Sequence, residues 1–394
     1  MGDFIIVLAI LLGIAIVLHA GYVFTLIYFI LGVYGVGLWW SKRSLKNISF
    51  RRSFVPHAFL GEDIKVDIVV ENQSLLPVAW VRLYESLPVE LSTPTNINQV
   101  ITLGPHGRVI LRYSLHAGKR GYYPVGPLFS FSGDLLGISS EQQGMGDVDY
   151  LTVYPRIITF TNVRFPSLSP QNLLPSSQII FEDPTRIWGK RDYMVGDSLR
   201  RVDWKATAVS GRLQVKQFEP SIASDTMIFL NLYSSDYEAR YRIDSIEFAI
   251  VVAASLASWI VKKKQSVGFI TNGVDQTDIS QCTNIIPSRK GYGHLTNILE
   301  SLSRLQPAEM VPIQSLLDRE SRQLSWGTTS LLITGKADDT LLENLFQLRK
   351  RGINPVIILV GRNQDSLEIM RKLKYFGIAA FRFMTERDLD IWRQ

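Results

Sequence analysis

Two apolar runs without a charged residue open the chain. The first covers residues 4–18 and the second covers residues 22–40, with three residues between them. A transmembrane helix needs about 20 apolar residues, within a range of roughly 17–25. We therefore predict two transmembrane helices, at about 4–20 and 22–40, that form a hairpin. The alternative is a single long helix that crosses the membrane at a tilt.

Apolar and polar residues alternate along the next part of the chain. Ile or Val stands at every second position from Ile64 to Val70, and residues 109–115 repeat the pattern. A period of two predicts strands with one buried face. Turn residues recur between the candidate strands, which indicates short connections. We predict that residues 47–158 form an antiparallel β-sandwich of about seven strands, of immunoglobulin-like size.

The chain changes character after this region. Residues 159–224 contain several prolines among Ser and Asn residues, which predicts a linker that also carries a charged motif. From residue 225 to residue 394, short apolar runs alternate with helical patterns. Buried strands that alternate with helices predict a doubly wound α/β domain with a parallel sheet. The candidate strands are 226–232, 266–271, 330–334 and 355–360, and the candidate helices are 242–264, 293–305 and 339–351.

One apolar run inside the α/β region could be taken for a third membrane span. Residues 248–261 carry no charge, and three lysines follow them at 262–264. At about 14 residues, the run is shorter than a membrane span. It also lies between two candidate strands. We therefore predict a buried helix that covers the sheet.

The net charge of +6 is concentrated beside the second apolar run. Residues 41–56 hold five Lys or Arg and no Asp or Glu, so the rest of the chain is nearly neutral. A nucleic-acid-binding protein spreads its basic residues over a folded face, which argues against that class. Positively charged segments stay in the cytoplasm, so we predict a multi-pass cell-membrane protein with cytoplasmic soluble domains. The basic residues are Lys42, Arg43, Lys46, Arg51 and Arg52.

The second apolar run has two features of membrane helices. Trp39 and Trp40 lie where interfacial aromatic residues are found. Gly32, Gly35 and Gly37 would let another helix approach closely. Self-association through the transmembrane helices is therefore among the contacts that we expect.

Few residues offer catalytic chemistry. The chain has one cysteine, so it can form neither an intrachain disulfide nor a cysteine-based zinc site. The motifs of zinc proteases, serine hydrolases, phosphate loops and dinucleotide-binding proteins do not occur. Ser235, His294 and an Asp can be written as a triad, but their spacing gives it no support. We expect no enzymatic activity and no cofactor.

The densest run of charged residues precedes the α/β region. Gly196 and Asp197 favour a turn, and we expect Asp197 to cap a short helix. Arg200 and Asp203 are three residues apart, so they can pair on that helix. Trp204 is a large anchor, surrounded by the donors of Arg191, Arg201 and Lys205. Two roles remain open for this run: a latch that holds the linker to the α/β domain, or a site for a partner or ligand.

This run resembles the signature of domain-of-unknown-function family 58, which is close to R-x-Y-x-x-G-D-x-x-R-x-I-D-W-K. It departs from that signature only at Val202, where the family has Ile. The signature residues here are Arg191, Tyr193, Gly196, Asp197, Arg200, Asp203, Trp204 and Lys205. Further residues in the family's style are Leu213, Lys216, Phe218 and Glu219 downstream, and Asn72, Pro77–Trp80, Arg120–Tyr122, Gly126–Pro127 and Val153–Pro155 upstream.

The resemblance extends over nearly the whole chain, including the paired apolar runs. It implies that the final domain is von Willebrand factor A-like. It also implies a cytoplasmic partner, commonly a MoxR-type AAA+ ATPase encoded nearby.

Metal-binding A domains have a D-x-S-x-S run after their first strand, with a Thr and an Asp on two further loops. These groups offer the oxygen ligands that Mg²⁺ prefers. The corresponding run here begins at Asn231 and retains only Ser235. The third loop carries Lys336 and no Asp at the matching place. We therefore predict a degenerate site, at Asn231 and Ser235, that holds no metal.

Together these features predict a membrane-anchored, non-enzymatic scaffold or adaptor. The expected partner is a MoxR-type AAA+ ATPase, and the expected process is the assembly or maturation of other proteins. The alternative is a membrane-associated hydrolase that acts at the cytoplasmic face. Folds of this class bind ligands at the C-terminal ends of their strands. The residues expected on this partner-binding edge are Tyr233, Ser234, Ser235 and Lys336.

Overall fold

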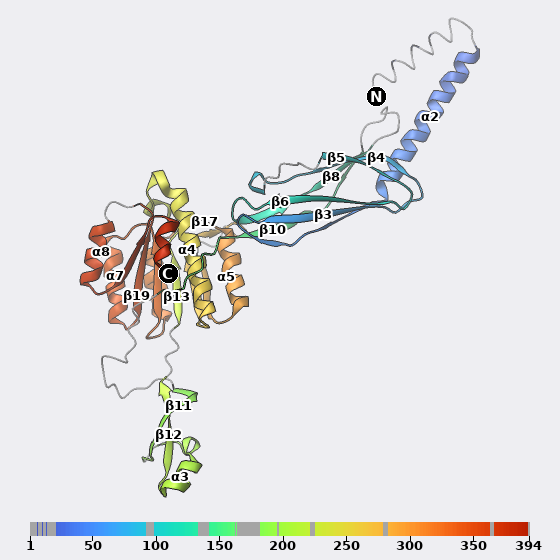
Figure 1. Cartoon of the computed structure of the whole chain (residues 1–394). Coiled ribbons are helices and arrows are strands. Elements are labelled where there is room, and N and C mark those ends of the chain that lie inside the picture. The colour runs from blue at the N-terminus through green and yellow to red at the C-terminus, as the bar shows by residue number, and fades with distance from the viewer. Residues whose placement is uncertain are drawn as a thin grey trace. The chain divides into compact units, whose positions relative to one another are not determined.

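The computed structural model describes residues 6, 10, 13, 21–91, 98–132, 142–161, 163, 182–194, 197–220, 225–278, 283–362 and 366–392 (Figure 1). Contacts between residues divide the chain into two compact units. The first comprises Met1–Arg156 with Leu302–Arg304, and the second comprises Ile157–Ser301 and Leu305–Gln394. The break after Arg156 lies close to the predicted boundary at residue 158.

Helix α2 (Gly21–Lys46) carries the second apolar run. Its apolar part, Gly21–Gly37, is at the lower limit of the roughly 17–25 residues that cross a membrane. Val23 and Ile27, one turn apart, are buried, so one face of the helix is covered. The predicted helix at 4–20, and with it the hairpin, lies outside the described residues apart from isolated positions.

The end of α2 is joined closely to the β-rich part of the first unit. A single residue, Asn47, separates the helix from strand β1 (Ile48–Ser53). The indole nitrogen of Trp40 donates to the carbonyl of Pro77 at 2.9 Å. The backbone N–H of Gln73 donates to the carbonyl of Asn47 at 2.8 Å. The loop between strands β3 and β4 therefore holds the end of the helix.

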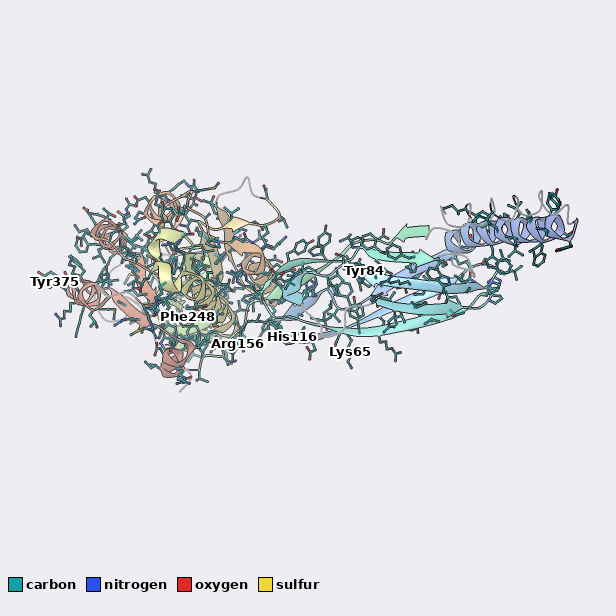
Figure 2. All side chains as sticks on the ribbon, turned by 90° about the horizontal axis from the view of Figure 1, so that it is seen from above. Lys65, Tyr84, His116, Arg156, Phe248 and Tyr375 are labelled. Atoms are coloured by element: carbon teal, nitrogen blue, oxygen red, sulfur yellow. The ribbon has the colours of Figure 1, made fainter. Side chains whose placement is uncertain are left out.

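The β-rich part is a sandwich of small sheets around one core. The strand orders are β1-β3-β6, β2-β10-β7 and β5-β4-β8-β9. The predicted alternation is confirmed in β3, where Ile64 and Val66 are buried and Lys65 points away from the core (Figure 2). The further elements are β2 (His57–Phe59), β3 (Asp63–Asn72), β4 (Val78–Glu85), η1 (Val89–Leu91), β5 (Asn98–Leu103), β6 (Arg108–His116), β7 (Gly121–Val125), β8 (Leu128–Ser132), β9 (Gln142–Met145) and β10 (Asp149–Tyr154).

The sandwich differs from the prediction in two ways. Its described residues form ten strands where about seven were predicted, and one pair, β2 with β10, is parallel. Strand β2 has three residues, which are too few for alternation to reveal. Its partner lies far along the chain, so no local turn signal marks the pairing.

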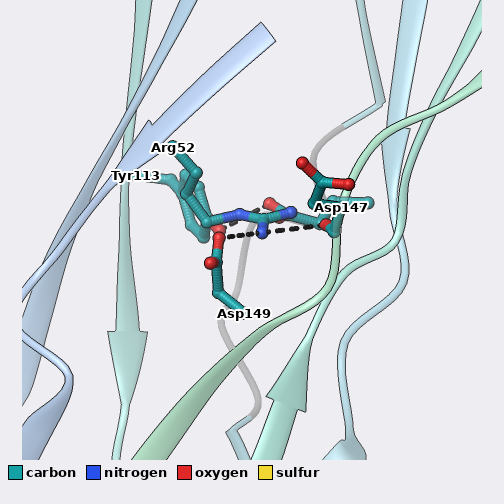
Figure 3. Close-up of polar contacts among 5 residues, drawn as sticks. Arg52, Tyr113, Asp147 and Asp149 are labelled. Carbon is teal, nitrogen blue, oxygen red and sulfur yellow. Dashed lines mark hydrogen bonds and ion pairs between the residues drawn. The ribbon is translucent and has the colours of Figure 1, made fainter.

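Arg52 is a buried residue of the sandwich, and its assignment to the basic membrane segment was wrong. Its side chain is 6% exposed. Its guanidinium donates to Glu85 at 2.6 and 2.8 Å and to Asp149 at 2.6 Å (Figure 3). The hydroxyl of Tyr113 donates to Glu85 at 2.5 Å, and burial together with the Glu85 charge raises the pKa of Tyr113. The basic segment therefore keeps Lys42, Arg43, Lys46 and Arg51.

The second unit contains a six-stranded sheet of order β16-β14-β13-β18-β19-β20. Five neighbouring strands are parallel, and the edge strand β16 is antiparallel to β14. Numbered along the chain, the order is 3-2-1-4-5-6, which reverses between β13 and β18. The strands are β13 (Thr226–Leu230), β14 (Val267–Thr271), β16 (Asn284–Arg289), β18 (Thr329–Thr334), β19 (Asn354–Val360) and β20 (Ala379–Phe383), with a separate ladder of β15 (Val274–Asp275) and β17 (Leu305–Gln306).

The predicted parallel sheet is therefore a mixed one. The sequence pattern missed β16 because Pro287 interrupts its run of isoleucines. Proline cannot donate to a β-ladder, so it is found on edge strands, which is where β16 lies. The four predicted strands correspond to β13, β14, β18 and β19, and β20 is a further parallel strand that was not predicted.

Helix α4 (Arg242–Lys262) is the predicted core helix. By length and composition it could cross a membrane, but most of its apolar part is buried. It contacts β13, β14, β18 and β19, so the alternative of a third span is wrong. A second hydrophobic cluster joins the sheet to α6, α7 and α8. The other helices are η4 (Ser234–Asp236), η5 (Ala239–Tyr241), α5 (Tyr292–Arg304), α6 (Ile313–Glu320), η6 (Ser321–Gln323), α7 (Asp339–Lys350), α8 (Ser366–Tyr375) and η7 (Glu386–Trp392).

Candidate functional site

Asn231 follows β13, at the point where the strand order of the sheet reverses. The residue is fully buried, and its amide is the centre of a hydrogen-bond network. Its Nδ2 donates to the carboxylate of Asp236 at 2.7 Å and to the hydroxyl of Thr334 at 2.9 Å. Its Oδ1 accepts from the backbone N–H of Tyr233 at 3.0 Å and from Nδ2 of Asn272 at 2.9 Å. An amide has two N–H donors and two acceptor positions, so Asn231 has no capacity left for a ligand.

The neighbours of Asn231 close the network further. Asn272 accepts from the backbone N–H of Leu232 at 2.7 Å and donates to the carbonyl of Val311 at 2.9 Å. The hydroxyl of Tyr237 donates to the backbone carbonyl of Asn231 at 2.6 Å, and burial raises the pKa of Tyr237. No spacing rule in the sequence marks Asn272 or Tyr237 as a partner of Asn231, because the sheet brings them together.

The two residues of the predicted degenerate metal site have different surroundings. Asn231 is buried and saturated, whereas Ser235 is exposed and its hydroxyl donates to the carboxylate of Glu309 at 2.8 Å. A cation beside Asn231 would face amide N–H groups that already donate to Asp236 and Thr334. The absence of metal binding stays a prediction, and the network supplies a physical reason for it.

The predicted partner-binding edge lies on two neighbouring loops. A Cβ at Gly335 would lie 2.6 Å from the backbone carbonyl of Asp236, so the two loops are in direct contact. Of the four predicted residues, Ser235 and Lys336 are exposed, and Tyr233 and Ser234 are half-buried. The structure thus brings the four residues to one edge. It leaves Tyr233 half-buried, so only part of its side chain is accessible to a partner.

Several charged side chains lie at this edge: Asp236, Asp338 and Glu309 against Lys336. Burial raises the pKa of Asp236, against the hydrogen bond from Asn231, which lowers it. The carboxylate of Asp338 raises this pKa further and the ammonium of Lys336 lowers it.

The serine–histidine pair considered in the sequence is engaged elsewhere. Ser235 donates to Glu309, and the imidazole Nε2 of His294 lies 2.8 Å from the carbonyl of Val267. His294 is buried at that position. Each side chain therefore has a separate partner, and the expectation of no catalysis stays a prediction.

The signature residues lie on a small module, residues 182–220, that we call the signature module (Figure 1). Its two strands pair antiparallel, with Arg191 opposite Val215. Helix α3 ends at Gly211, whose left-handed φ of 70° favours glycine. The elements are β11 (Glu182–Asp192), η3 (Leu199–Arg201), α3 (Trp204–Ser210) and β12 (Gln214–Pro220).

Arg191 and Asp197 fix the turn that follows β11. The guanidinium donates through Nη1 and Nη2 to the two carboxylate oxygens, each at 2.7 Å, in a bidentate pair. Asp197 also accepts from the backbone N–H of Met194 at 2.9 Å. The Arg191 hydrogen bonds, and then the Met194 N–H, hold the pKa of Asp197 below its usual range. The prediction that Asp197 caps the helix was wrong, because its carboxylate is used in the turn.

Asp203 is the residue that caps α3. Its Oδ1 accepts from the backbone N–H groups of Lys205 and Ala206, both at 3.1 Å. Its Oδ2 lies 2.8 Å from Nζ of Lys190, and this contact is the main reason that the pKa of Asp203 is lowered. The predicted pair of Arg200 with Asp203 was therefore wrong. Lys190 lies on β11, so local spacing could not identify it.

Three signature side chains are exposed and take no part in this frame. They are Arg200, Trp204 and Lys205, and Trp204 is 67% exposed. Tyr193 is half-buried, and its backbone N–H donates to the carbonyl of Leu213 at 2.9 Å. Gly196 lies outside the described residues. The signature thus divides into residues that hold the module and residues that it presents.

Upstream residues in the family's style shape the sandwich. The amide of Asn72 donates to the carbonyls of Leu76 and Gly104 at 2.8 and 2.9 Å, which closes the loop between β3 and β4. Gly126 has a φ of +104°, and a Cβ there would lie 2.7 Å from Nη2 of Arg52. These positions serve the fold.

The family described as "Protein of unknown function DUF58" matches residues 189–364. The match begins in the signature module and continues through β19. The chain is a member of the DUF58 family. This confirms the resemblance that the signature residues indicated.

The DUF58 protein is 23% identical over 257 residues to the uncharacterized protein YeaD of Bacillus subtilis (strain 168). The match covers 65% of this chain and 60% of the relative, so it spans less than two thirds of the relative's length. Among solved structures, the CARDB domain of the PF1109 protein from Pyrococcus furiosus has a TM-score of 0.21 and 14% identity, covering 27% of this chain and 91% of that domain. An aerotolerance-related membrane protein from Bacteroides fragilis NCTC 9343 has a TM-score of 0.30 and 13% identity, covering 43% of this chain and 94% of that one. Both TM-scores are too low to imply a shared fold.

Proposed function

We propose that this DUF58 protein is a membrane-anchored, non-enzymatic scaffold whose soluble domains bind other proteins. The observation that carries the proposal is the saturated amide of Asn231. Doubly wound sheets place their ligand sites where the strand order reverses. At that position here, four hydrogen bonds use the whole capacity of one buried amide. In this proposal the α/β domain therefore acts by binding other proteins through its surface.

The assignment of the α/β domain as von Willebrand factor A-like has support in its topology. The strand order is 3-2-1-4-5-6 with an antiparallel edge strand at β16. Asn231 follows the first strand, where a metal-binding A domain has its first Asp, and Thr334 on a neighbouring strand reaches it. In this proposal the amide replaces the metal as the link between the two loops. The sandwich, in the same proposal, is an immunoglobulin-like domain between the anchor and the A-like domain.

Membrane anchoring is supported by α2 and its flanks. The apolar part of the helix is followed by Lys42, Arg43, Lys46 and Arg51, and cations of this kind mark the cytoplasmic side. We accordingly place the sandwich and the α/β domain in the cytoplasm. Cβ positions at Gly32 and Gly35 meet nothing within 4 Å, which leaves room there for a second helix.

The proposed partner is a MoxR-type AAA+ ATPase, which the family resemblance implies. The test is affinity purification of the full-length protein from native membranes after mild crosslinking. We expect the ATPase to be recovered with the wild-type protein. We also expect it to be recovered with the Ser235→Ala variant, in which Asn231 is unchanged. A control purification uses a chain with α2 and the sandwich but without residues 157–394.

Two outcomes would contradict the proposal. If no ATPase is recovered with the full-length protein, the scaffold has a different partner or none. If the purified full-length protein hydrolyses ester, phosphoester or peptide substrates and Ser235→Ala abolishes that activity, the alternative of a membrane-associated hydrolase replaces it.

A further inference from the structure

Among the side chains of the signature module that the structure describes, in residues 189–194 and 197–216, more large apolar ones are exposed than buried. The buried apolar ones are Val202 and Val215. Five apolar side chains that are at least as large as Val are exposed: Met194, Leu199, Trp204, Val209 and Leu213. Val209 is 87% exposed. A monomeric protein seldom gathers such side chains on a small segment unless they meet a partner.

Most of these side chains belong to one short stretch, which we call the Trp204 surface. It comprises Leu199, Arg200, Trp204, Lys205 and Val209, and all five are exposed. Lys205 and Val209 are one turn apart on α3, so they share a helix face. An exposed aromatic residue close in sequence to exposed aliphatic residues and cations has the composition of an interface centre.

Positive charge is concentrated in the middle of the module, whereas the whole module, residues 182–220, has eight Lys or Arg and six Asp or Glu. Between residues 190 and 216 there are seven Lys or Arg and three Asp, which gives a net charge of +4. Asp197 and Asp203 pair with Arg191 and Lys190, and Asp192 accepts from the side-chain amide of Gln214. All three carboxylates are therefore engaged within the module. The exposed cations of this stretch are Lys190, which pairs with Asp203, and Arg200, Arg201, Lys205 and Arg212.

The frame beneath the Trp204 surface is fixed before any partner arrives. The Arg191–Asp197 pair sets the turn before η3, and the Asp203 cap sets the first turn of α3. Leu199 and Trp204 lie directly after these two restraints. A surface that is held in advance loses less conformational entropy on binding.

We propose that the Trp204 surface is the docking site of a partner protein and that it takes an acidic segment in which carboxylates flank an apolar side chain. The proposal rests on the proposed scaffold function and names its surface and the chemistry of its partner. Charge complementarity selects the occupant, since the three Asp between residues 190 and 216 are engaged internally and the same stretch presents exposed cations. A nucleic acid would be bound by a row of cations and would not need exposed Leu199 and Val209. A membrane surface would call for a longer apolar helix face than the seven residues of α3 provide.

The experiment uses the full-length protein in phosphatidylcholine nanodiscs with the purified MoxR-type ATPase. A photo-crosslinking phenylalanine derivative replaces Leu199 and, in a control chain, the exposed Ile243 of the α/β domain. Mass spectrometry then maps the crosslinked peptides. We expect the Leu199 position to crosslink to a segment of the ATPase with Asp or Glu beside an apolar residue, and the Ile243 position not to do so.

Charge reversal is the second arm of the experiment. Arg200→Glu with Lys205→Glu should weaken binding of the ATPase by about tenfold or more and reduce its dependence on salt. The matched control is Arg289→Glu with Lys290→Glu, which changes the net charge by the same amount on exposed residues of the α/β domain. The control should bind as the wild type does. Equal weakening by both pairs would overturn the docking site, because only long-range charge would then matter.

The outcomes separate the docking site from the scaffold. If the wild type binds the ATPase, but the Leu199 position does not crosslink to it and Arg200→Glu with Lys205→Glu binds normally, the docking site is wrong and the scaffold stands. If the wild type does not bind the ATPase, the proposed partner is wrong. The Leu199 crosslink in native membranes then decides the docking site. A crosslink to an acidic segment that charge reversal abolishes supports it, whereas a crosslink to lipid, to nucleic acid, to the same chain or to nothing overturns it.

Discussion

The network at Asn231 and the signature module use similar polar groups in opposite ways. At Asn231, an amide, a carboxylate and a hydroxyl are turned inward, and every hydrogen-bonding position of the amide is used within the protein. In the signature module, two carboxylates hold the backbone while an aromatic ring and several cations are exposed. The first arrangement stabilises a fold where related topologies bind ligands. The second displays a surface, and this difference supports our proposal that recognition lies away from the conventional ligand position of the sheet.

The largest effect on stability should follow from breaking the inward network. Asn231→Ala leaves Asn272 and the N–H of Tyr233 without their acceptor, and buried groups without a partner each cost about 1–3 kcal/mol. We expect the free energy of unfolding of the α/β domain to fall by about 2–4 kcal/mol. Hydrogen exchange of β13, β14 and β18 in the full-length protein measures this change. The matched control is Ser235→Ala, which removes an exposed hydroxyl and should change stability by about 0.5 kcal/mol or less. A loss at Asn231 no larger than the control's would contradict the account of the network.

A smaller and local effect should follow from breaking the frame of the signature module. Asp203→Ala removes the cap of α3 and the partner of Lys190. We expect amide protection in α3 to be lost while the protection of β13 and β18 is unchanged, because no residue of α3 is buried and the helix therefore depends on its cap. Arg200→Ala, at the position first expected to pair with Asp203, is the control and should leave α3 protected. Loss of protection in both variants would mean that the pairing is not the one in the structure.

Much of the fold follows from local patterns, and the exceptions have physical causes. Strand β3 was predictable because its buried residues alternate with the period of a strand. Helix α4 was predictable because its apolar run is buried along most of its length. Arg52 was misassigned because a strand residue that pairs with distant Glu85 looks, in sequence, like its charged neighbours. Strand β16 was missed because Pro287 breaks its pattern.

The candidate sites were predictable in position and not in contacts. The signature residues stand out in the sequence. So does Asn231, which stands where the D-x-S-x-S run of metal-binding A domains has its Asp. The partners of these residues come from other strands, as Lys190 does for Asp203 and Asn272 does for Asn231. Local spacing suggested the i,i+3 pair of Arg200 with Asp203. In the structure, Asp203 pairs instead with Lys190 on β11.

Acidification should act on the two regions with opposite signs. The pKa values of Asp197 and Asp203 are lowered, so their contribution to stability is present above the ordinary Asp pKa and is lost as the pH falls through their lowered values. The pKa of Asp236 is raised by burial, so the folded state favours its protonated form and loses that contribution as the pH rises through the raised value. As the pH falls below the ordinary Asp pKa of 3.8, we expect amide protection of α3 to fall, while the loop after β13 keeps the protection that it gains as the pH falls through the raised pKa of Asp236. Hydrogen exchange over this range measures both segments in one sample. A parallel fall in both would contradict the opposite signs.

The smallest effect on stability, and the largest on binding, should come from the exposed ring of the signature. Trp204→Ala removes a side chain that is 67% exposed, so the thermal midpoint should stay close to that of the wild type. Tyr292→Ala is the matched control, because Tyr292 is an aromatic residue with the same exposed fraction on the α/β domain.

The most direct test of the account is the affinity of the MoxR-type ATPase for the full-length protein in nanodiscs, compared among the wild type, Trp204→Ala and Tyr292→Ala. We predict that Trp204→Ala weakens binding by about tenfold or more, as the loss of an interface anchor does, while Tyr292→Ala binds as the wild type does. Equal affinities for all three proteins would contradict the claim that the signature presents Trp204 to a partner.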